Sequence, residues 1–316
     1  MQAARKQAPM SFMEKLNNIY CIDGMMRGFE KYMSLYVIKG KEIVMVDTGE
    51  RMRFETTKAQ IEALGIKLSD ITRIFITHGH QDHLGGAAPL IREMPNAKVY
   101  AHPACKQRLT DPGSIDWKAI FSPGTMARIT MEMEPVPEDR IVYVNDGDEF
   151  DLGEGTVLKI KLINFHQPSG LVVYDLKNNG LFGNDLTGNY FADCGYHIIL
   201  HPPDSQFFVE YEYIRELLKN PPAHLYLGHF GIIEDAPTYL KETFEHETWM
   251  IEASKKCVDE GHPEKVMEVI RDKNLESAKN LLKRGDQKLY DYATQEHIPP
   301  QAQTFANLFL SKYGKQ

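Results

Sequence analysis

The most informative segment of this sequence is Thr77-His78-Gly79-His80-Gln81-Asp82-His83. Residues 72–76, which precede it, are rich in β-branched and aromatic side chains and predict a buried strand. Gly85, Gly86 and a helical pattern of apolar residues follow it. We therefore expect the stretch to form a loop at the carboxyl end of a strand, which is where open α/β sheets place their ligands.

The stretch carries three imidazoles and one carboxylate within six residues. Charged imidazoles this close would repel one another, and all four groups would be costly to remove from water. A bound cation resolves both difficulties, because neutral imidazole and carboxylate are good ligands for zinc and for non-haem iron. We therefore interpret the stretch as part of a metal site rather than as a solvated polar loop.

Three more potential ligands, His166, Asp185 and His229, each follow an apolar segment that has the pattern of a strand. In each case a glycine or proline lies close by, as is typical of a strand end. A lone histidine is more often a hydrogen-bonded surface or core residue. The recurrence of one strand-end arrangement beside the histidine-rich stretch favours a shared site instead.

Five motifs resemble those of the metallo-β-lactamase superfamily, and they occur in the order found in that family. They are VDTG at Asp47, HxHxDH at residues 78–83, HQPSG at His166, GND at Asp185 and GH at His229. The match covers roughly residues 18–235, and HxHxDH is highly specific. The middle motif departs from the usual PGHTPG form, since Asn164-Phe165 replaces Pro-Gly and Ser169 replaces Gly. This departure bears on the substrate more than on the metal.

The resemblance implies an α+β fold, a four-layer αββα sandwich of two mixed sheets. It also implies two divalent metal ions, with His78, His80 and His166 on one, Asp82, His83 and His229 on the other, and Asp185 as a bridge. Asp47 would orient a ligand histidine through a hydrogen bond. Zinc suits this ligand set, and iron or manganese would also fit, because ligand type alone does not separate them.

The resemblance further implies a hydrolase that attacks a small acyl substrate (a thioester, ester or lactone) with a metal-bridging hydroxide. Asp82 is one expected catalytic residue, as a ligand. Tyr190 is the other, since related lactonases use a tyrosine shortly after the bridging aspartate, though at a different spacing. Its phenol would donate a hydrogen bond to a carbonyl oxygen. The alternative is that Tyr190 is an aromatic residue packed under the loop.

Three other functions remain open. Flavodiiron proteins use the same fold to handle oxygen at a di-iron site, but they carry a flavodoxin domain and replace the second histidine of HxHxDH, here His80, with glutamate. A phosphodiesterase or nuclease, as among tRNA-processing members, is disfavoured by the acidic charge. A signalling or binding protein that retains the metals but little turnover is consistent with the full ligand set.

Residues 1–236 are expected to form the metallo-β-lactamase-fold domain, and residues 237–316 a C-terminal helical extension, because only helical spacing follows Glu234. The extension packs on the sandwich or on itself, or covers the metal cleft, or forms a homodimer. Residues 111–139 combine four prolines with an apolar segment and predict a lid or a helical insert. As a lid they would favour a small-molecule substrate with an apolar portion.

Composition narrows the remaining classes. The net charge is -8 and the pI about 5.9, and no basic run suggests a nucleic-acid partner. No stretch has the length of a membrane span, and the polar N-terminus lacks the apolar core of a signal peptide. The scattered cysteines suggest reduced thiols and a cytoplasmic location. Four further histidines lack a partner at ligand spacing and are expected at the surface: His201, His246, His262 and His297.

Overall fold

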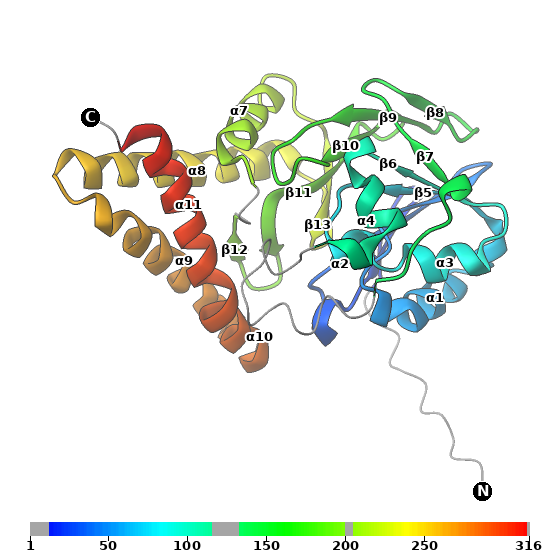
Figure 1. The fold of residues 1–316 in the computed structure, drawn as a ribbon, viewed down its shortest axis with the longest axis horizontal. Helices are drawn as coiled ribbons and strands as arrows, with labels where there is room; N and C mark the ends of the chain where they lie inside the picture. The colour runs from blue at the N-terminus through cyan, green and yellow to red at the C-terminus, as the bar shows by residue number, and fades with distance from the viewer. Residues whose placement is uncertain (1–12, 116–132, 200–204, 315–316) are drawn as a thin grey trace, which may run out of the picture.

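Two β-sheets packed face to face form the centre of the molecule, and helices cover their outer sides (Figure 1). The computed structural model describes residues 13–115, 133–199 and 205–314. Within these ranges each sheet contains seven strands and mixes parallel with antiparallel neighbours. The predicted αββα sandwich with a C-terminal helical region is confirmed.

The first sheet keeps its strands in chain order. Neighbours are antiparallel as far as β4 and parallel from β4 to β7, where longer segments cross over. The parallel pair β4 and β5 therefore ends at one edge of the sheet and delivers Asp47 and Thr77 side by side. The strands are β1 (Met13–Leu16), β2 (Ile19–Asp23), β3 (Ser34–Lys39), β4 (Ile43–Val46), β5 (Ile71–Ile76), β6 (Lys98–Ala101) and β7 (Ile141–Tyr143).

The second sheet has the order β14-β13-β11-β10-β9-β8, with β12 paired to the far end of β11. Its parallel pair is β11 and β13, and the other neighbours are antiparallel. The strands are β8 (Glu149–Asp151), β9 (Val157–Leu162), β10 (Leu171–Asp175), β11 (Gly180–Phe191), β12 (Tyr196–Ile198), β13 (His224–His229) and β14 (Ile232–Ile233).

The helices lie in three places. Helices α1 and α3 contact each other beside the first sheet, α7 and α8 contact each other beside the second, and α8 to α11 form the C-terminal region (Figure 1). A π-helical segment, Ala293–His297, joins α10 to α11. The helices are α1 (Phe54–Ala63), α2 (Gln81–Leu84), α3 (Ala87–Glu93), α4 (Lys106–Thr110), α7 (Phe207–Leu217), α8 (Ala236–Asp259), α9 (Val266–Lys283), α10 (Gln287–Tyr292) and α11 (Ile298–Tyr313).

The main core lies between the two sheets. Tyr36 of β3 shows how they are held together, because its ring contacts Phe182 and Tyr226 of the second sheet and its hydroxyl donates to the carbonyl of Leu227, 2.7 Å away. A buried tyrosine is stable here because its polar tip has a partner. A second core, around Phe165 and Leu240, lies where α7 and α8 cover the second sheet.

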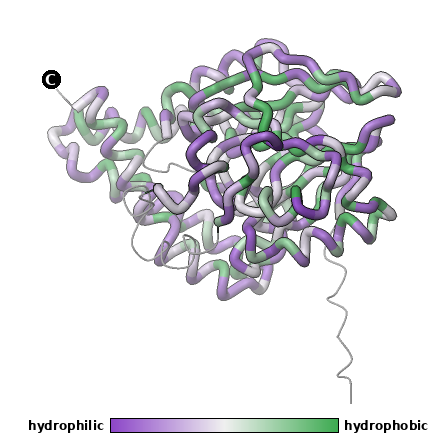
Figure 2. Tube along the Cα trace, turned by 45° about the vertical axis from the view of Figure 1, so that its right-hand side comes forward, coloured by the Kyte–Doolittle hydropathy of each residue, from purple (hydrophilic) through white to green (hydrophobic). Residues whose placement is uncertain are grey.

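The C-terminal helices share the main core with the sheets. Ala278, Leu281 and Ile298 are buried in the same cluster as Phe191 and Tyr196. Hydrophobic and hydrophilic residues are interspersed along these helices (Figure 2). A helix with this pattern can turn its hydrophobic side to the interior and its hydrophilic side to water. The predicted packing of the extension on the sandwich is therefore present. The division into domains 1–236 and 237–316 stays a prediction, although α8 does begin at Ala236.

Two further sequence expectations have separate outcomes. Most of the proposed lid, including Trp117, lies outside the described residues, so the lid stays a prediction. No helix in the described ranges combines the length and apolar character needed to cross a membrane.

Candidate metal centre

The histidine-rich stretch follows β5 directly, as predicted, but it is only partly a loop. Residues 77–80 form the connection, and α2 then places Asp82 and His83 on a helical turn. Gly79 is required in the connection, because an added Cβ would lie 2.7 Å from Arg108 Cδ and 3.0 Å from Gln167 Oε1. The side chains of the β9–β10 connection thus press against the backbone of the stretch.

The other candidate ligands come from the second sheet. His166 lies in the β9–β10 connection, Asp185 within β11, and His229 at the end of β13. The pairing of β11 with β13 shifts register on both sides of Asn184, whose φ is 59°, so the strand is irregular where Asp185 projects. Irregular pairing of this kind is a common way to re-aim a side chain at a site. Gly228 leaves room for it, since a Cβ there would lie 2.6 Å from Asp185 Oδ1.

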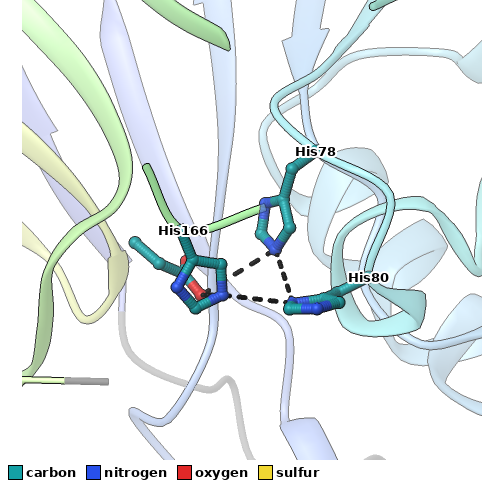
Figure 3. Close-up of side chains that lie close together, drawn as sticks. His78, His80 and His166 are labelled. Atoms are coloured by element: carbon teal, nitrogen blue, oxygen red, sulfur yellow. Dashed lines mark hydrogen bonds and ion pairs between the residues drawn. The ribbon is translucent and has the colours of Figure 1, made fainter. Parts of the chain in front are cut away.

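The first group of candidate ligands is the one shown in Figure 3, where the rings of His78 and His80, from the connection after β5, and of His166, from the β9–β10 connection, point toward one another. His80 Nδ1 lies 2.9 Å from His78 Nε2 and 3.1 Å from His166 Nε2. Asp185 Oδ2 is 3.1 Å from His166 Nε2. One ligand atom from each of the four residues falls within 4.8 Å of all the others, close enough to share one ion.

The second group contains Asp82, His83 and His229, again with ligand atoms within 4.8 Å of one another. Asp82 Oδ2 is 3.7 Å from His83 Nε2 and 3.5 Å from His229 Nε2. Asp185 joins the two groups, because its Oδ1 lies 3.2 Å from His83 Nε2 while its Oδ2 faces His166. The two groups contain the side chains that the sequence analysis assigned to two ions, and their binding of metal stays a prediction.

The electrostatics of the cluster call for added positive charge. Burial, reinforced by the neighbouring imidazoles, holds the pKa of His78 and His80 well below the usual histidine value, so both rings are neutral. Burial also disfavours a charged His83, but the carboxylates around it, led by Asp185, outweigh that effect and raise its pKa well above the usual value. Neutral imidazoles are the form that binds metals, and a cation at His83 would take the place of the proton.

Unsatisfied buried atoms also fit a metal. His83 Nε2 and Asp185 Oδ1 are both buried and lie 3.2 Å apart, but neither is aligned for a hydrogen bond with any atom in the described part of the chain. Leaving two such atoms unpaired is costly, whereas coordination to a cation satisfies both. The donor set of imidazole nitrogen and carboxylate oxygen suits zinc, iron and manganese alike, so the structure supports a two-ion site without identifying the metal.

Hydrogen bonds behind the cluster fix the orientation of two histidines. Asp47 Oδ2 lies 2.7 Å from His83 Nδ1, and the Thr77 hydroxyl donates to the same oxygen at 2.8 Å. The carbonyl of Tyr32 lies 2.6 Å from His229 Nδ1 and accepts its proton. In both histidines the Nδ1 atom is thereby occupied and Nε2 is left to face the centre, as is usual for metal-ligating histidines.

Tyr190 lies apart from this cluster. Its ring contacts the rings of Tyr239 and His197, at centroid separations of 4.8 and 5.4 Å. Burial raises the pKa of Tyr190, with smaller contributions from Glu242 and Cys194, and none of these neighbours is a candidate ligand. The surroundings favour the packing interpretation of Tyr190 over the hydrogen-bond donor interpretation.

Sequence analysis missed a set of residues beside the second group. Arg27, Tyr32 and Tyr292 contact one another there, and His297 packs against the two tyrosines. The surface prediction is wrong for His297 and His246, which are half-buried with a buried ring nitrogen, and right for the exposed His262. His201 lies outside the described residues. No local motif marks these positions, because they meet only through tertiary packing.

The sequence and the structure are similar to those of known proteins. The family model described as "Metallo-beta-lactamase superfamily" matches residues 28–229. The sequence is 25% identical over 206 residues to "Putative diflavin flavoprotein A 1" of Thermosynechococcus vestitus, covering 64% of this chain and 31% of that protein. It is 27% identical over 159 residues to "Anaerobic nitric oxide reductase flavorubredoxin" of Salmonella arizonae, covering 50% of this chain and 29% of that protein.

The matched part of this chain thus spans about a third of the length of these two relatives. Among solved structures, a metallo-beta-lactamase family protein from Thermus thermophilus superposes with a TM-score of 0.65, covering 95% of each chain at 17% sequence identity. At this identity the likeness concerns the fold alone, and it includes the C-terminal helical region as well as the sandwich.

Proposed function

Because this chain belongs to the metallo-beta-lactamase superfamily, we propose that it is a hydrolase that uses two divalent metal ions to cleave a small acyl substrate: a thioester, ester or lactone. The observation that carries the proposal is the position of Asp185. Its two carboxylate oxygens face the two candidate groups separately, with Oδ1 3.2 Å from His83 Nε2 and Oδ2 3.1 Å from His166 Nε2. One residue can therefore hold two neighbouring ions.

The proposal gives each candidate ligand a specific role. His78, His80 and His166 would hold one ion, and Asp82, His83 and His229 the other, with Asp185 between them. When bound, such ions supply a Lewis acid and lower the pKa of water toward neutrality. Asp47 and the carbonyl of Tyr32 keep two imidazoles in the required tautomer. Burial of the whole cluster strengthens every electrostatic interaction within it.

Two observations favour an acyl substrate and an attack by water. Burial raises the pKa of the Cys105 thiol to about 11, so this cysteine is not a ready thiolate nucleophile. The ring of Tyr32 lies 5.8 Å from that of the candidate ligand His229, and the rings of Phe191 and Tyr292 pack on Tyr32. They would accommodate an apolar portion of the substrate, which fits an acyl chain better than a bare phosphate or sugar.

A di-iron oxidoreductase is the second candidate, because relatives found by sequence are named as a diflavin flavoprotein and a nitric oxide reductase flavorubredoxin. Against this candidate, the second histidine of the HxHxDH motif is retained as His80, which points into the first group. Residues 236–313 are helical throughout most of their length, unlike a flavodoxin domain of alternating strands and helices.

One set of measurements separates these functions. Elemental analysis of the purified protein should find about two transition-metal ions per chain, and His80→Ala or Asp185→Asn should lower that number and abolish activity. Rates are then measured on a matched thioester, lactone and phosphodiester. We expect the thioester or lactone to be preferred.

Four outcomes would contradict the proposal. Full metal occupancy in both His80→Ala and Asp185→Asn would show that the ligand assignment is wrong. A clear preference for the phosphodiester would move the chain to the phosphodiesterase or nuclease branch. Oxygen consumption with an electron donor, and no hydrolysis of any substrate, would support the oxidoreductase. Bound metal without any turnover would leave the signalling or binding alternative.

A further inference from the structure

Arg27 is placed between the candidate metal centre and the C-terminal region. It lies in the connection between β2 and β3, with a left-handed backbone (φ 55°). Its guanidinium stacks over the ring of Tyr292 in α10, with 4.7 Å between Cζ and the ring centroid. The carboxylate of Glu50 and, more weakly, that of Asp82, a candidate ligand of the second group, act on its charge. A cation is therefore held at the edge of the centre by a residue of the C-terminal extension.

The guanidinium of Arg27 lacks the partners that a buried arginine normally has. It makes no ion pair with any described residue, and its Nε atom is buried without a hydrogen-bond partner in the described part of the chain. Glu50 attracts the charge of Arg27, but its Oε2 accepts the backbone N–H of that residue at 2.8 Å and forms no ion pair with the guanidinium in the described part of the chain. An arginine fork that remains unpaired in a partly buried place is suited to bind a planar anion.

Metal binding would make the need for an anion greater. If Asp82 coordinates an ion, its charge is neutralised and no longer compensates Arg27. The guanidinium would then face a centre that carries two divalent ions, and repulsion between them is strong in a partly buried site. A carboxylate bound by Arg27 would relieve that repulsion.

Three aromatic residues, which we call the aromatic wall, lie beside Arg27: Tyr32, Tyr292 and His297. Tyr292 and His297 are stacked with centroids 5.6 Å apart, and Tyr32 meets both rings edge-on. Tyr32 also lies 5.8 Å from the ring of the candidate ligand His229, so the wall is continuous with the centre. His297 ends the π-helical segment, an element that is frequent at functional sites. Its buried Nδ1 has no hydrogen-bond partner among the described residues.

We propose that Arg27 and the aromatic wall bind a carboxylate-bearing end of the substrate, while the acyl bond lies at the metals. The inference rests on the proposed function and names its substrate class: an acyl compound with an additional carboxylate and a short apolar spacer. The C-terminal extension would then be part of the binding site, since two of the three wall residues belong to it. Arg27 would act in recognition, and its removal would affect binding rather than the reacting atoms.

A purely structural role for Arg27, as an anchor of the extension, is the rival interpretation. Arg284 shows what such an anchor looks like. It also stacks on a ring, with Cζ 5.2 Å from the centroid of Phe191, but it donates to the carbonyl of Glu30 at 2.7 Å and lies 3.8 Å from Asp193. Arg284 thus has two polar partners beside its stacked ring, although its buried Nη1 has none, whereas the Arg27 guanidinium has no hydrogen bond or ion pair among the described residues. Arg284→Gln is therefore the matched control for Arg27→Gln.

A binding experiment tests the proposal without relying on turnover. Binding of succinate and of butyrate to the full-length protein as purified is measured by calorimetry, with metal content and thermal unfolding recorded for each sample. The two probes have the same chain length, but succinate carries a second carboxylate. We expect the wild type and Arg284→Gln to prefer succinate by roughly tenfold to a hundredfold, the range implied by a hydrogen-bonded charge pair. Arg27→Gln should lose this preference and keep its metal.

Two results would overturn the proposal: no preference for succinate in the wild type, or an unchanged preference in Arg27→Gln. If Arg27→Gln does not fold, Arg27→Met, which keeps an apolar stem against Tyr292, is measured with the same expectation.

Hydrolysis of p-nitrophenyl butyrate and p-nitrophenyl hemisuccinate then separates this inference from the proposed function. Arg27→Gln should raise KM for the hemisuccinate more than KM for the butyrate, whereas Arg284→Gln should leave both esters at wild-type values. Loss of the succinate preference without hydrolysis of either ester supports the anion site and contradicts the acyl hydrolase. Hydrolysis of both esters with equal losses in Arg27→Gln contradicts the anion site and keeps the hydrolase.

Discussion

Asp47 and His83 are joined by a hydrogen bond of 2.7 Å between Oδ2 and Nδ1, although they stand 36 residues apart. The other oxygen of Asp47 accepts the backbone N–H of Thr77 at 2.8 Å. One carboxylate therefore orients an imidazole and fixes the backbone that leads into the histidine-rich stretch. The end of β4 and the end of β5 are tied together at the point where the candidate centre begins.

Asp47→Asn should weaken metal binding by about tenfold to a hundredfold, the usual effect of losing a partner that orients a ligand histidine. The amide cannot hold the Nδ1 proton of His83 as a carboxylate does, so Nε2 is no longer presented in one state. Competition with a chelator measures the affinity. Asp70→Asn, at an exposed position near the start of β5, is the control and should leave it unchanged. Equal affinity in Asp47→Asn and wild type would contradict an orienting role.

The sandwich and the grouping of the ligands were predictable because their signals are local. Each candidate ligand lies close in sequence to an apolar segment with the pattern of a strand. Pairing between neighbouring strands then fixes where such a ligand lies. The position of Arg27 beside the candidate centre could not be predicted from local sequence signals. It meets Tyr292, 265 positions later in the numbering, only after the C-terminal helices have packed on β11 and β12. The same packing buries His297, which therefore departs from its expected surface position.

Tyr190→Phe should change the catalytic rate by no more than about twofold, because the hydroxyl group lies among Tyr239 and His197 rather than at the cluster. Loss of a group that stabilises a developing oxyanion would instead cost roughly a hundredfold or more. Rates on the preferred acyl substrate, with metal content measured in parallel, decide between the two. A large loss of rate at full metal content would restore Tyr190 as a hydrogen-bond donor to the substrate.

From the buried carboxyl groups of Glu210 and Glu247 we predict how the free energy of unfolding depends on pH. Glu210 of α7 and Glu247 of α8 are fully buried, and their carboxyl oxygens have no hydrogen-bond partner in the described part of the chain. Burial raises the pKa of both groups well above the usual glutamate value, and Glu247 adds to the effect on Glu210. The folded state thus keeps both protonated at pH values where the unfolded chain ionises them. Stability is therefore lost as pH rises from the unfolded pKa toward the folded one.

Glu247→Gln removes one of these ionisations and should stabilise the protein at about pH 8, where the cost of keeping the wild-type carboxyl protonated is greatest. We expect a midpoint of thermal unfolding at least about 2 °C higher than that of wild type, with a smaller difference at about pH 5. Glu245→Gln, at an exposed position of the same helix, should show no such trend. A lower midpoint for Glu247→Gln at both pH values would show that the ionised carboxylate has a stabilising partner.

Deletion of residues 238–316 should make the remaining chain aggregate or change its oligomeric state. The deletion removes Tyr239 and Leu240, which are buried against Leu186 and Leu227 of the second sheet, and the helices that bury Tyr196 of β12. Each large side chain returned to water costs about 1.5–3 kcal/mol, and an apolar face of this kind seeks another protein surface. Size-exclusion chromatography with light scattering measures the mass.

A chain that ends at Gly314 is the matched control for this deletion, since it keeps every helix through α11, and it should behave as the full-length protein. The comparison also bears on recognition. If the extension supplies Tyr292 and His297 to the substrate site, any soluble fraction of the truncated chain should bind metal but lose the preference for succinate over butyrate. A truncated chain with unchanged mass, kinetics and succinate preference would show that the extension is dispensable, and would exclude it from the binding site.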